Sequence, residues 1–245
     1  MTITSLFMQT WKDRNIPDKW KTSPQAIRKF YPNAKYVLLT HEDIRNFMLN
    51  NFPNYMQVFD NLPKQICRID MFRYAWLYVN GGVYMDLDYE LIKPLDFLER
   101  DKGIFISRER TVPSYYTNSF LASHKHCDFW LYCLSEIVKR FNNKPFYIID
   151  DFRVLYITGP IMITHVVNHY PGVINIISYH YLMPCDYGKG SCDYRLSYRL
   201  DLTGDSWTGS FIKIVRNIHA YKEQVIVVVV LVVILIVCLC LLEKK

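Results

Sequence analysis

The sequence predicts an α/β domain with a mostly parallel central sheet and helices on both of its faces, followed by a C-terminal transmembrane helix. Strand-like and helix-like segments alternate along the N-terminal part of the chain, which is typical of parallel sheets with helical cover. The stretch 66–88 changes from a helical to a strand pattern and ends in two aspartates. A chain of 245 residues, 51% of them hydrophobic, can bury one large core, so we expect a single domain over residues 1–220.

The first elements are predicted from short apolar runs and capping signals. Residues 3–8 and 35–39 predict two strands, and residues 25–30 predict a helix between them. Thr40 or His41 is expected to begin the next helix, because acidic residues occupy its first turn.

The central stretch combines a helix, a strand and an acidic turn. Residues 66–79 predict a helix, because apolar side chains recur at helical spacing on or near one face. The two glycines at 81–82 end it, since glycine adopts the left-handed conformation common at helix ends. Residues 83–85 are β-branched and aromatic and predict a buried strand, and Asp-Leu-Asp follows at 86–88. The acids therefore lie at a strand end, where α/β sheets usually hold their ligands.

The same helix carries a charged pair. Asp70 and Arg73 are three residues apart and share a face, which Tyr74 and Leu77 continue. Such a pair is either a structural ion pair or part of a polar site. The two carboxylates just beyond the glycines favour the site.

The later elements are predicted in the same way. Residues 103–107 and 173–179 predict strands, and residues 127–141 form an amphipathic helical pattern. Thr-Gly-Pro at 158–160 is expected to open a further helix. Residues 188–209 are rich in glycine and tyrosine and are typical of a flexible lid loop.

Asp86 and Asp88 suit a hard divalent cation, Mn²⁺ or Mg²⁺. Such ions prefer oxygen ligands and keep open positions for a substrate's diphosphate, which they stabilise as a leaving group. An Asp-x-Asp pair alone is a weak signal, because solvated acidic pairs are common. Here the pair follows an apolar strand, which favours the functional interpretation.

Other chemistries are excluded by spacing. The net charge of +6 is spread along the chain without a dense basic run, which argues against nucleic acid. Neither a P-loop nor a dinucleotide-binding glycine motif is present. Ser206 lies near a serine-hydrolase pattern, but Thr208 occupies the position of its second glycine. The cysteines and histidines lack zinc spacing.

These motifs resemble glycosyltransferase family 32, which includes fungal mannosyltransferases and those that act on inositol phosphorylceramide. The central match is R-I-D-M-F-R-Y-A-W-L-Y-V-N-G-G-V-Y-M-D-L-D, residues 68–88. Q-T-W-K at 9–12 resembles the family's H-Q-T-W-K, with Met8 in place of the histidine. T-G-P at 158–160 and S-W at 206–207 resemble two later motifs.

The resemblance implies a GT-A fold and a retaining, metal-dependent glycosyltransferase that uses a nucleotide sugar. Asp88 would be the principal metal ligand, and Asp86 would contact the ribose and sugar or the metal through water. Asp70 and Arg73 would hold the donor sugar, and Arg73 would also lie near the diphosphate. The remaining nucleotide-sugar-binding residues would be Trp11, stacking on the base, Tyr74, and Ser206 and Trp207, closing over the diphosphate.

The expected reaction moves a hexose, with mannose favoured, from GDP-mannose or a UDP-hexose to a lipid or glycan acceptor. Inositol phosphorylceramide is the acceptor that the resemblance suggests. Front-face transfer and a covalent route through Asp70 both remain open. The alternative function is a catalytically silent membrane scaffold that keeps the fold.

Residues 225–242 are apolar without interruption and would span about 27 Å as a helix, enough to cross a bilayer. We therefore expect a single-pass C-terminal anchor. An anchor so close to the last residue favours a cytosolic domain, whereas family relatives mostly work in the Golgi lumen. Cys185 and Cys192 could form a disulfide in an oxidising compartment, but the odd number of cysteines before the anchor favours free thiols.

Overall fold

The computed structural model describes residues 2–100, 103–143, 150–186, 191–202 and 204. Its centre is a six-stranded sheet in the order β2-β1-β3-β6-β5-β7. β6 runs antiparallel to both neighbours, and the other adjacent pairs are parallel, which confirms a mostly parallel sheet. The strands are β1 (Leu6–Thr10), β2 (Lys35–Leu39), β3 (Gly82–Met85), β5 (Ile104–Arg108), β6 (Tyr116–Ser123) and β7 (Ile174–Ile177).

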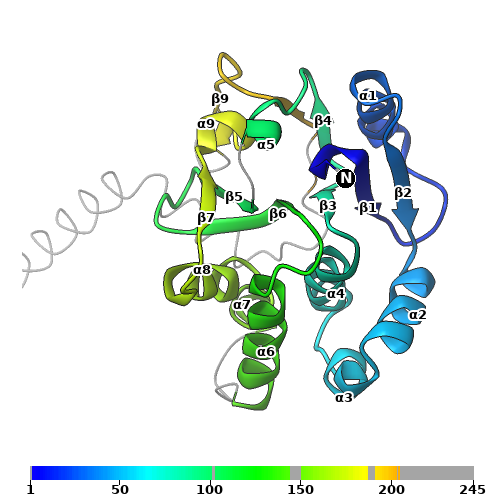
Figure 1. Ribbon diagram of the computed structural model, residues 1–245, viewed down its shortest axis with the longest axis vertical. Helices are drawn as coiled ribbons and strands as arrows, with labels where there is room; N and C mark the ends of the chain where they lie inside the picture. The colour runs from blue at the N-terminus through cyan, green and yellow to red at the C-terminus, as the bar shows by residue number, and fades with distance from the viewer. Residues whose placement is uncertain (1, 101–102, 144–149, 187–190, 203, 205–245) are drawn as a thin grey trace, which may run out of the picture.

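Helices cover both faces of the sheet, as predicted (Figure 1). One core lies under α2, α4, α6 and α8 and takes Met8 and Tyr84 from the strands. The other lies under α1, α5 and α9 and takes the alternate strand residues Phe7 and Val83, as the pleat requires. The helices are α1 (Thr22–Phe30), α2 (His41–Asn51), α3 (Met56–Asp60), α4 (Gln65–Asn80), α5 (Phe97–Arg100), α6 (Phe129–Asn142), α7 (Asp150–Ile157), α8 (Pro160–His169) and α9 (Tyr179–Leu182).

Two small sheets lie beside the main one. β4 (Tyr89–Leu91) pairs antiparallel with β10 (Arg199–Asp201), and β8 (Cys185–Asp186) pairs with β9 (Ser191–Cys192). Short 3-10 helices occur at η1 (Ile3–Ser5), η2 (Asp18–Trp20) and η3 (Pro53–Tyr55).

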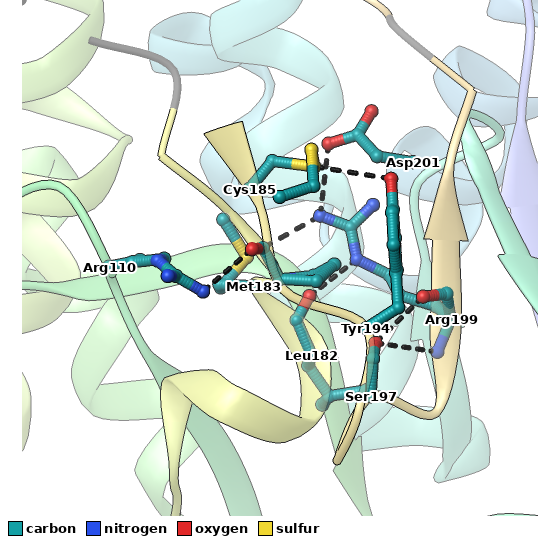
Figure 2. Close-up of a disulfide and its surroundings, with 10 residues drawn as sticks. Arg110, Leu182, Met183, Cys185, Tyr194, Ser197, Arg199 and Asp201 are labelled. Carbon is teal, nitrogen blue, oxygen red and sulfur yellow. Dashed lines mark hydrogen bonds and ion pairs between the residues drawn. A yellow bond between two sulfur atoms is a disulfide. The ribbon is translucent and has the colours of Figure 1, made fainter. Parts of the chain in front are cut away.

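A disulfide joins Cys185 to Cys192 and closes the β8–β9 hairpin (Figure 2). Of the two alternatives that the sequence left open, the structure has the disulfide, against the preference for free thiols. The odd cysteine count does not decide pairing, because Cys67 and Cys133 are sequestered in the core as free thiols. Pairing depends on which side chains the backbone brings together.

Local signals explain the element boundaries near the acidic turn. The Thr40 side chain and Asp43 form a capping box, which starts α2 as predicted. Gly81 and Gly82 have φ of 67° and 91°, and a Cβ at Gly82 would lie 2.6 Å from the Leu6 carbonyl oxygen. Glycine therefore both ends α4 and lets β3 pack closely against the chain at β1.

Three predicted boundaries are wrong in part. Residues 3–5 form a 3-10 turn, and the first strand instead extends to Thr10. β7 is shorter than the predicted strand 173–179, because α9 begins at Tyr179. Residues 191–202 were expected in a flexible lid but contain paired strands and the fully buried Arg199.

No helix among the described residues has both the length and the apolar character to cross a membrane. The predicted anchor at 225–242 lies outside the described residues, as do Ser206 and Trp207.

Candidate active site

The site begins on the buried face of α4. Asp70 and Arg73 are each 3% exposed, and their Oδ1 and Nη2 atoms lie 3.0 Å apart. Apolar residues such as Trp76 and Val79, which predicted the helix, lie on its less buried side. The helix therefore turns its charged pair toward the centre of the molecule, where an ion pair is costly unless its groups are fully bonded.

Two neighbouring elements complete the bonding of Asp70. Thr158, just before α8, donates its hydroxyl to Asp70 Oδ2 at 2.9 Å. Asn118, on β6, donates from Nδ2 to Asp70 Oδ1 at 3.0 Å. Burial nevertheless outweighs Arg73 and these bonds and raises the pKa of Asp70 to about 6.

Tyr74 supports the same network and is fully buried. Its hydroxyl donates to the Thr158 carbonyl oxygen at 2.9 Å and accepts from Asn118 Nδ2 at 3.2 Å. In this structure Tyr74 thus supports Asp70 indirectly, through its hydrogen bonds with Thr158 and Asn118. Sequence reasoning missed Asn118, because its strand carries no motif, and noted Thr158 only as a helix start.

Arg73 joins the helix to the acidic turn. Its Nη1 lies 3.6 Å from Asp86 Oδ1, so one guanidinium faces acids from two elements. Its plane lies over the Tyr84 ring, 4.3 Å from the centroid, and the Tyr84 hydroxyl donates to Asp86 Oδ1. Arg73 and Tyr84 therefore fix the direction of the Asp86 carboxylate, a role that the sequence does not reveal for Tyr84.

The main chain of the acidic turn is held from several sides. The Asp86 N–H donates to the Ser119 carbonyl at 2.9 Å, and the Tyr89 N–H donates to the Asp86 carbonyl at 3.2 Å. The Leu202 N–H donates to the Asp88 carbonyl at 2.9 Å. Bonds from β6, the turn itself and the segment after β10 thus orient both carboxylates.

Asp88 has the features of a metal ligand. Its Oδ1 is buried and has no hydrogen-bond partner among the described residues. Burial and the nearby Asp86 raise its pKa to about 7, with Arg199 opposing them. Gly204 packs closely here, since a Cβ would lie 2.1 Å from Asp88 Oδ2. A buried carboxylate oxygen that lacks a donor fits a divalent cation, which would supply the missing positive charge.

Within the described ranges, no three His, Cys, Asp or Glu side chains are grouped as a metal site. Asp86 and Asp88 could therefore provide only part of a cation's coordination. The open positions suit the oxygens of a phosphate-bearing ligand and water, as Mg²⁺ sites commonly use.

A cap formed by residues 178–186 and 191–202 lies beside the acidic turn, because β10 pairs with β4. Figure 2 shows Arg199 enclosed within this cap. The guanidinium of Arg199 is fully buried, lies over the Tyr89 ring and pairs with Asp201 at 3.5 Å. Its Nε donates to the Leu182 carbonyl, so β10 is tied back to α9. The sequence carried no signal for this arrangement, because β10 has three residues and its partner β4 is remote in the chain.

Trp11 lies at the same edge of the sheet, directly after β1, whose neighbour β3 leads into the acidic turn. Its ring packs edge-on against Trp20 with centroids 4.8 Å apart. Its Nε1 is buried and lacks a hydrogen-bond partner among the described residues. The structure thus brings Trp11, Asp86 and Asp88 to one edge, while Ser206 and Trp207 lie outside the described residues.

The site as a whole has one buried arginine, Arg73, between two acids. Beside it lies the buried carboxylate of Asp88, whose Oδ1 suits a cation. Such an arrangement can hold a polyhydroxylated group through Asp70 and Arg73 while a cation at Asp88 binds a phosphate. The chemistry therefore depends on electrostatics and positioning.

The proteins with similar sequences are glycosyltransferases. Residues 17–104 match the family model described as a glycosyltransferase sugar-binding region containing a DXD motif. Inositol phosphoceramide mannosyltransferase 1 of Schizosaccharomyces pombe is 31% identical over 247 residues, covering 98% of this chain and 73% of that protein.

Other matches are more partial. Inositol phosphoceramide mannosyltransferase 3 of the same yeast is 32% identical over 66% of this chain and 44% of that protein. Among solved structures, the PaToxG glycosyltransferase has a TM-score of 0.49 and 21% identity over 69% of this chain and 70% of that one. The extent of the match to the first relative, together with the DXD region, shows the family. This chain belongs to the glycosyltransferases with a DXD-containing sugar-binding region, and it is a glycosyltransferase.

Proposed function

We propose that this protein is a metal-dependent, retaining mannosyltransferase that transfers mannose from a nucleotide sugar, GDP-mannose, to a glycolipid acceptor of the inositol phosphorylceramide class. The observation that carries the proposal is Arg73 between Asp70 and Asp86, beside an Asp88 oxygen without a hydrogen-bond partner among the described residues. The names of the most similar relatives support the sugar and the acceptor. The chain covers 73% of the first relative but under half of the next two, so the substrates remain a proposal.

Asp88, with Asp86, would hold Mn²⁺ or Mg²⁺, and a GT-A type of donor site is proposed around them. The cation would neutralise the diphosphate and stabilise it as the leaving group. Arg73 lies within 3.6 Å of Asp86 and is positioned to add positive charge on the same side. Trp11 would stack on the base, and Ser206 and Trp207 would exclude water from the donor.

The contacts of Asp70 favour front-face transfer over a covalent intermediate. Its carboxylate accepts from Thr158, Asn118 and Arg73, and its side chain is 4% exposed. A nucleophile needs a free oxygen aimed at the sugar carbon, and these bonds occupy both oxygens. Asp70 is better placed to orient Arg73 and the donor, while the acceptor hydroxyl attacks on the face that the diphosphate leaves.

The membrane placement is also a proposal. Residues 225–242 would anchor the protein, which suits a lipid acceptor. The Cys185–Cys192 disulfide favours an oxidising compartment such as the Golgi or ER lumen over the cytosolic side expected from the sequence. We infer the lumenal side, because a disulfide in this hairpin would be reduced in the cytosol.

The function can be tested with the full chain purified in detergent. Release of sugar from GDP-mannose, UDP-glucose, UDP-galactose and UDP-N-acetylglucosamine would be followed with and without Mn²⁺. We expect metal-dependent turnover of GDP-mannose, and transfer when inositol phosphorylceramide is added. Asp88→Asn should lose both, whereas Asp60→Asn, an exposed acid paired with Arg45, should retain them.

The absence of turnover together with the absence of metal-dependent nucleotide binding would contradict the proposal and favour a silent scaffold. Preferential turnover of a UDP-sugar would contradict mannose as the donor sugar but leave the metal-dependent transferase intact.

A further inference from the structure

Gln9 is a fully buried amide on β1, next to the acidic turn. Its Nε2 donates to the Asp86 carbonyl oxygen at 3.2 Å and to Ser23 Oγ at 2.8 Å. Its Oε1 accepts from the Tyr36 hydroxyl at 3.0 Å. Burying an amide costs free energy unless its polar ends are hydrogen-bonded, as those of Gln9 are. Its bond to Asp86 therefore depends on the geometry of the turn.

The chemistry of these partners fixes the orientation of the amide. The Asp86 carbonyl can only accept a hydrogen bond, so the NH₂ group of Gln9 must face it. The opposite oxygen then faces the hydroxyl of Tyr36, which donates. Gln9 therefore cannot rotate by half a turn without placing two acceptors together at Asp86.

The network continues to the other end of the turn. Ser23, fully buried at the start of α1, accepts from Gln9 and donates its one hydroxyl proton to the Tyr89 carbonyl oxygen. The Asp86 carbonyl also accepts from the Tyr89 N–H. The carbonyls that begin and end the turn 86–89 are thus both held by side chains from the N-terminal part of the chain.

We propose that Gln9 is a positioning residue for the metal-binding turn. By fixing the Asp86 carbonyl, it fixes the peptide plane that joins Asp86 to Leu87, and with it the direction in which the main chain continues to Asp88. Partners behind the ligands commonly orient metal-binding carboxylates, and their loss typically lowers metal affinity 10–100-fold. The proposal rests on the proposed function in that Asp88 and Asp86 hold the cation.

The test compares the loss of the whole amide with the loss of one of its partners. Gln9→Met keeps the length of the side chain but removes both of its polar ends, including the donor to Asp86. Tyr36→Phe removes only the hydrogen bond to Oε1, on the side away from the turn. Each variant loses buried hydrogen bonding and stability, so unfolding temperature alone does not separate a positioning role from a structural one.

Two measurements on the full chain in detergent separate them. Mn²⁺ affinity, measured by titration calorimetry, should fall about tenfold or more in Gln9→Met and change less than about twofold in Tyr36→Phe. Amide hydrogen exchange in the metal-free protein should speed up across residues 86–91 in Gln9→Met alone.

Equal Mn²⁺ affinity in Gln9→Met and the parent, or an equal loss in Tyr36→Phe, would overturn the proposal. If Gln9→Met does not fold, Ser23→Ala provides the second variant, because it removes the contact with the Tyr89 carbonyl and should also speed exchange in the turn. Unchanged exchange in that variant would count equally against the network. If the parent chain binds no divalent cation, the proposed function fails, whereas the exchange result still reports on Gln9.

Discussion

At Arg73 one buried guanidinium balances carboxylates from two elements, and this balance makes the residue important for stability as well as for the site. Asp70 contacts it at 3.0 Å and Asp86 at 3.6 Å, while Tyr84 covers its plane. In a buried position an acid cannot exchange its partner for water. The stability of the fold and the geometry of the site therefore depend on the same atoms.

Replacing Arg73 by Met should leave Asp70 charged or protonated without its cation. We expect a loss of about 3–5 kcal/mol in the free energy of unfolding, measured by urea denaturation. Arg45→Met is the matched control, because Arg45 pairs with Asp60 on the surface with 54% of its side chain exposed. Its loss should be much smaller, because an exposed ion pair that is screened by water contributes little to stability. Equal losses in the two variants would contradict the buried pairing.

The raised pKa of Asp88 predicts how metal binding depends on pH. The pKa is about 7 without metal, and a cation binds only the ionised carboxylate. Mn²⁺ affinity should therefore be nearly constant above pH 8 and fall by about tenfold per pH unit below 7, steeper where Asp86 also takes up a proton. Titration calorimetry between about pH 5.5 and about pH 8.5 checks this dependence. An affinity independent of pH across that window would contradict a buried, protonated Asp88.

At the scale of elements, the junctions of α4, β3 and β10 determine where the acids lie. The strand β3 starts at Gly82, where an added Cβ would lie 2.6 Å from the Leu6 carbonyl oxygen, and it links the end of α4 to the acidic turn. β10 then closes the far side by pairing with β4. The site is therefore sensitive to changes in backbone that contact no ligand.

Gly82→Ala should destabilise the protein more than Gly103→Ala. Both glycines have positive φ, 91° and 120°, so both variants incur similar backbone strain. At Gly82 the added Cβ would clash with backbone, 2.6 Å from the Leu6 carbonyl oxygen, whereas at Gly103 the nearest atom is a side-chain nitrogen at 3.5 Å. Thermal unfolding of the two variants checks the order. A larger loss at Gly103 would contradict the close packing of β3 on β1.

The disulfide acts at the level of the cap. It closes a loop with a sequence separation of 7, which in the chain-entropy model stabilises the fold by about 2–3 kcal/mol. The Cys185→Ser, Cys192→Ser double variant should lose roughly that amount, measured by denaturation. Cys67 and Cys133, which are buried and unbridged, should react with alkylating reagents only after unfolding. Rapid alkylation of Cys185 in the native, non-reduced protein would contradict the pairing.

At the scale of the whole molecule, the site is assembled from several separate segments of the chain. β1, β2 and β3 form the side that carries Trp11 and the acidic turn, while β6 contributes Asn118 and the cap contributes Arg199. Helices cover both faces of the sheet (Figure 1), and Trp11 and the acidic turn lie at the edge where β1 and β3 end. Transfer at that edge would benefit from rigid placement of groups that come from distant segments.

Much of this could be predicted before the structure. The helix at 66–79, its glycine end, the strand after it and the Asp-Leu-Asp turn all depend on local patterns, and each is confirmed within a few residues. The pairing of Asp70 with Arg73 followed from helical geometry. Local propensity and periodicity operate over a few residues, so sequence alone was sufficient for these features.

Only the tertiary structure decided what lies around them. β6 gave no sequence signal, yet its Asn118 bonds Asp70 from 48 residues away. Gln9 and Ser23 hold the acidic turn, Arg199 covers Tyr89, and Cys185 pairs with Cys192. These contacts join segments that share no local pattern, because they arise from the spatial arrangement of the strands and loops. The sequence by itself determined the acidic turn and its family, and the packing of remote strands decided how its carboxylates are held.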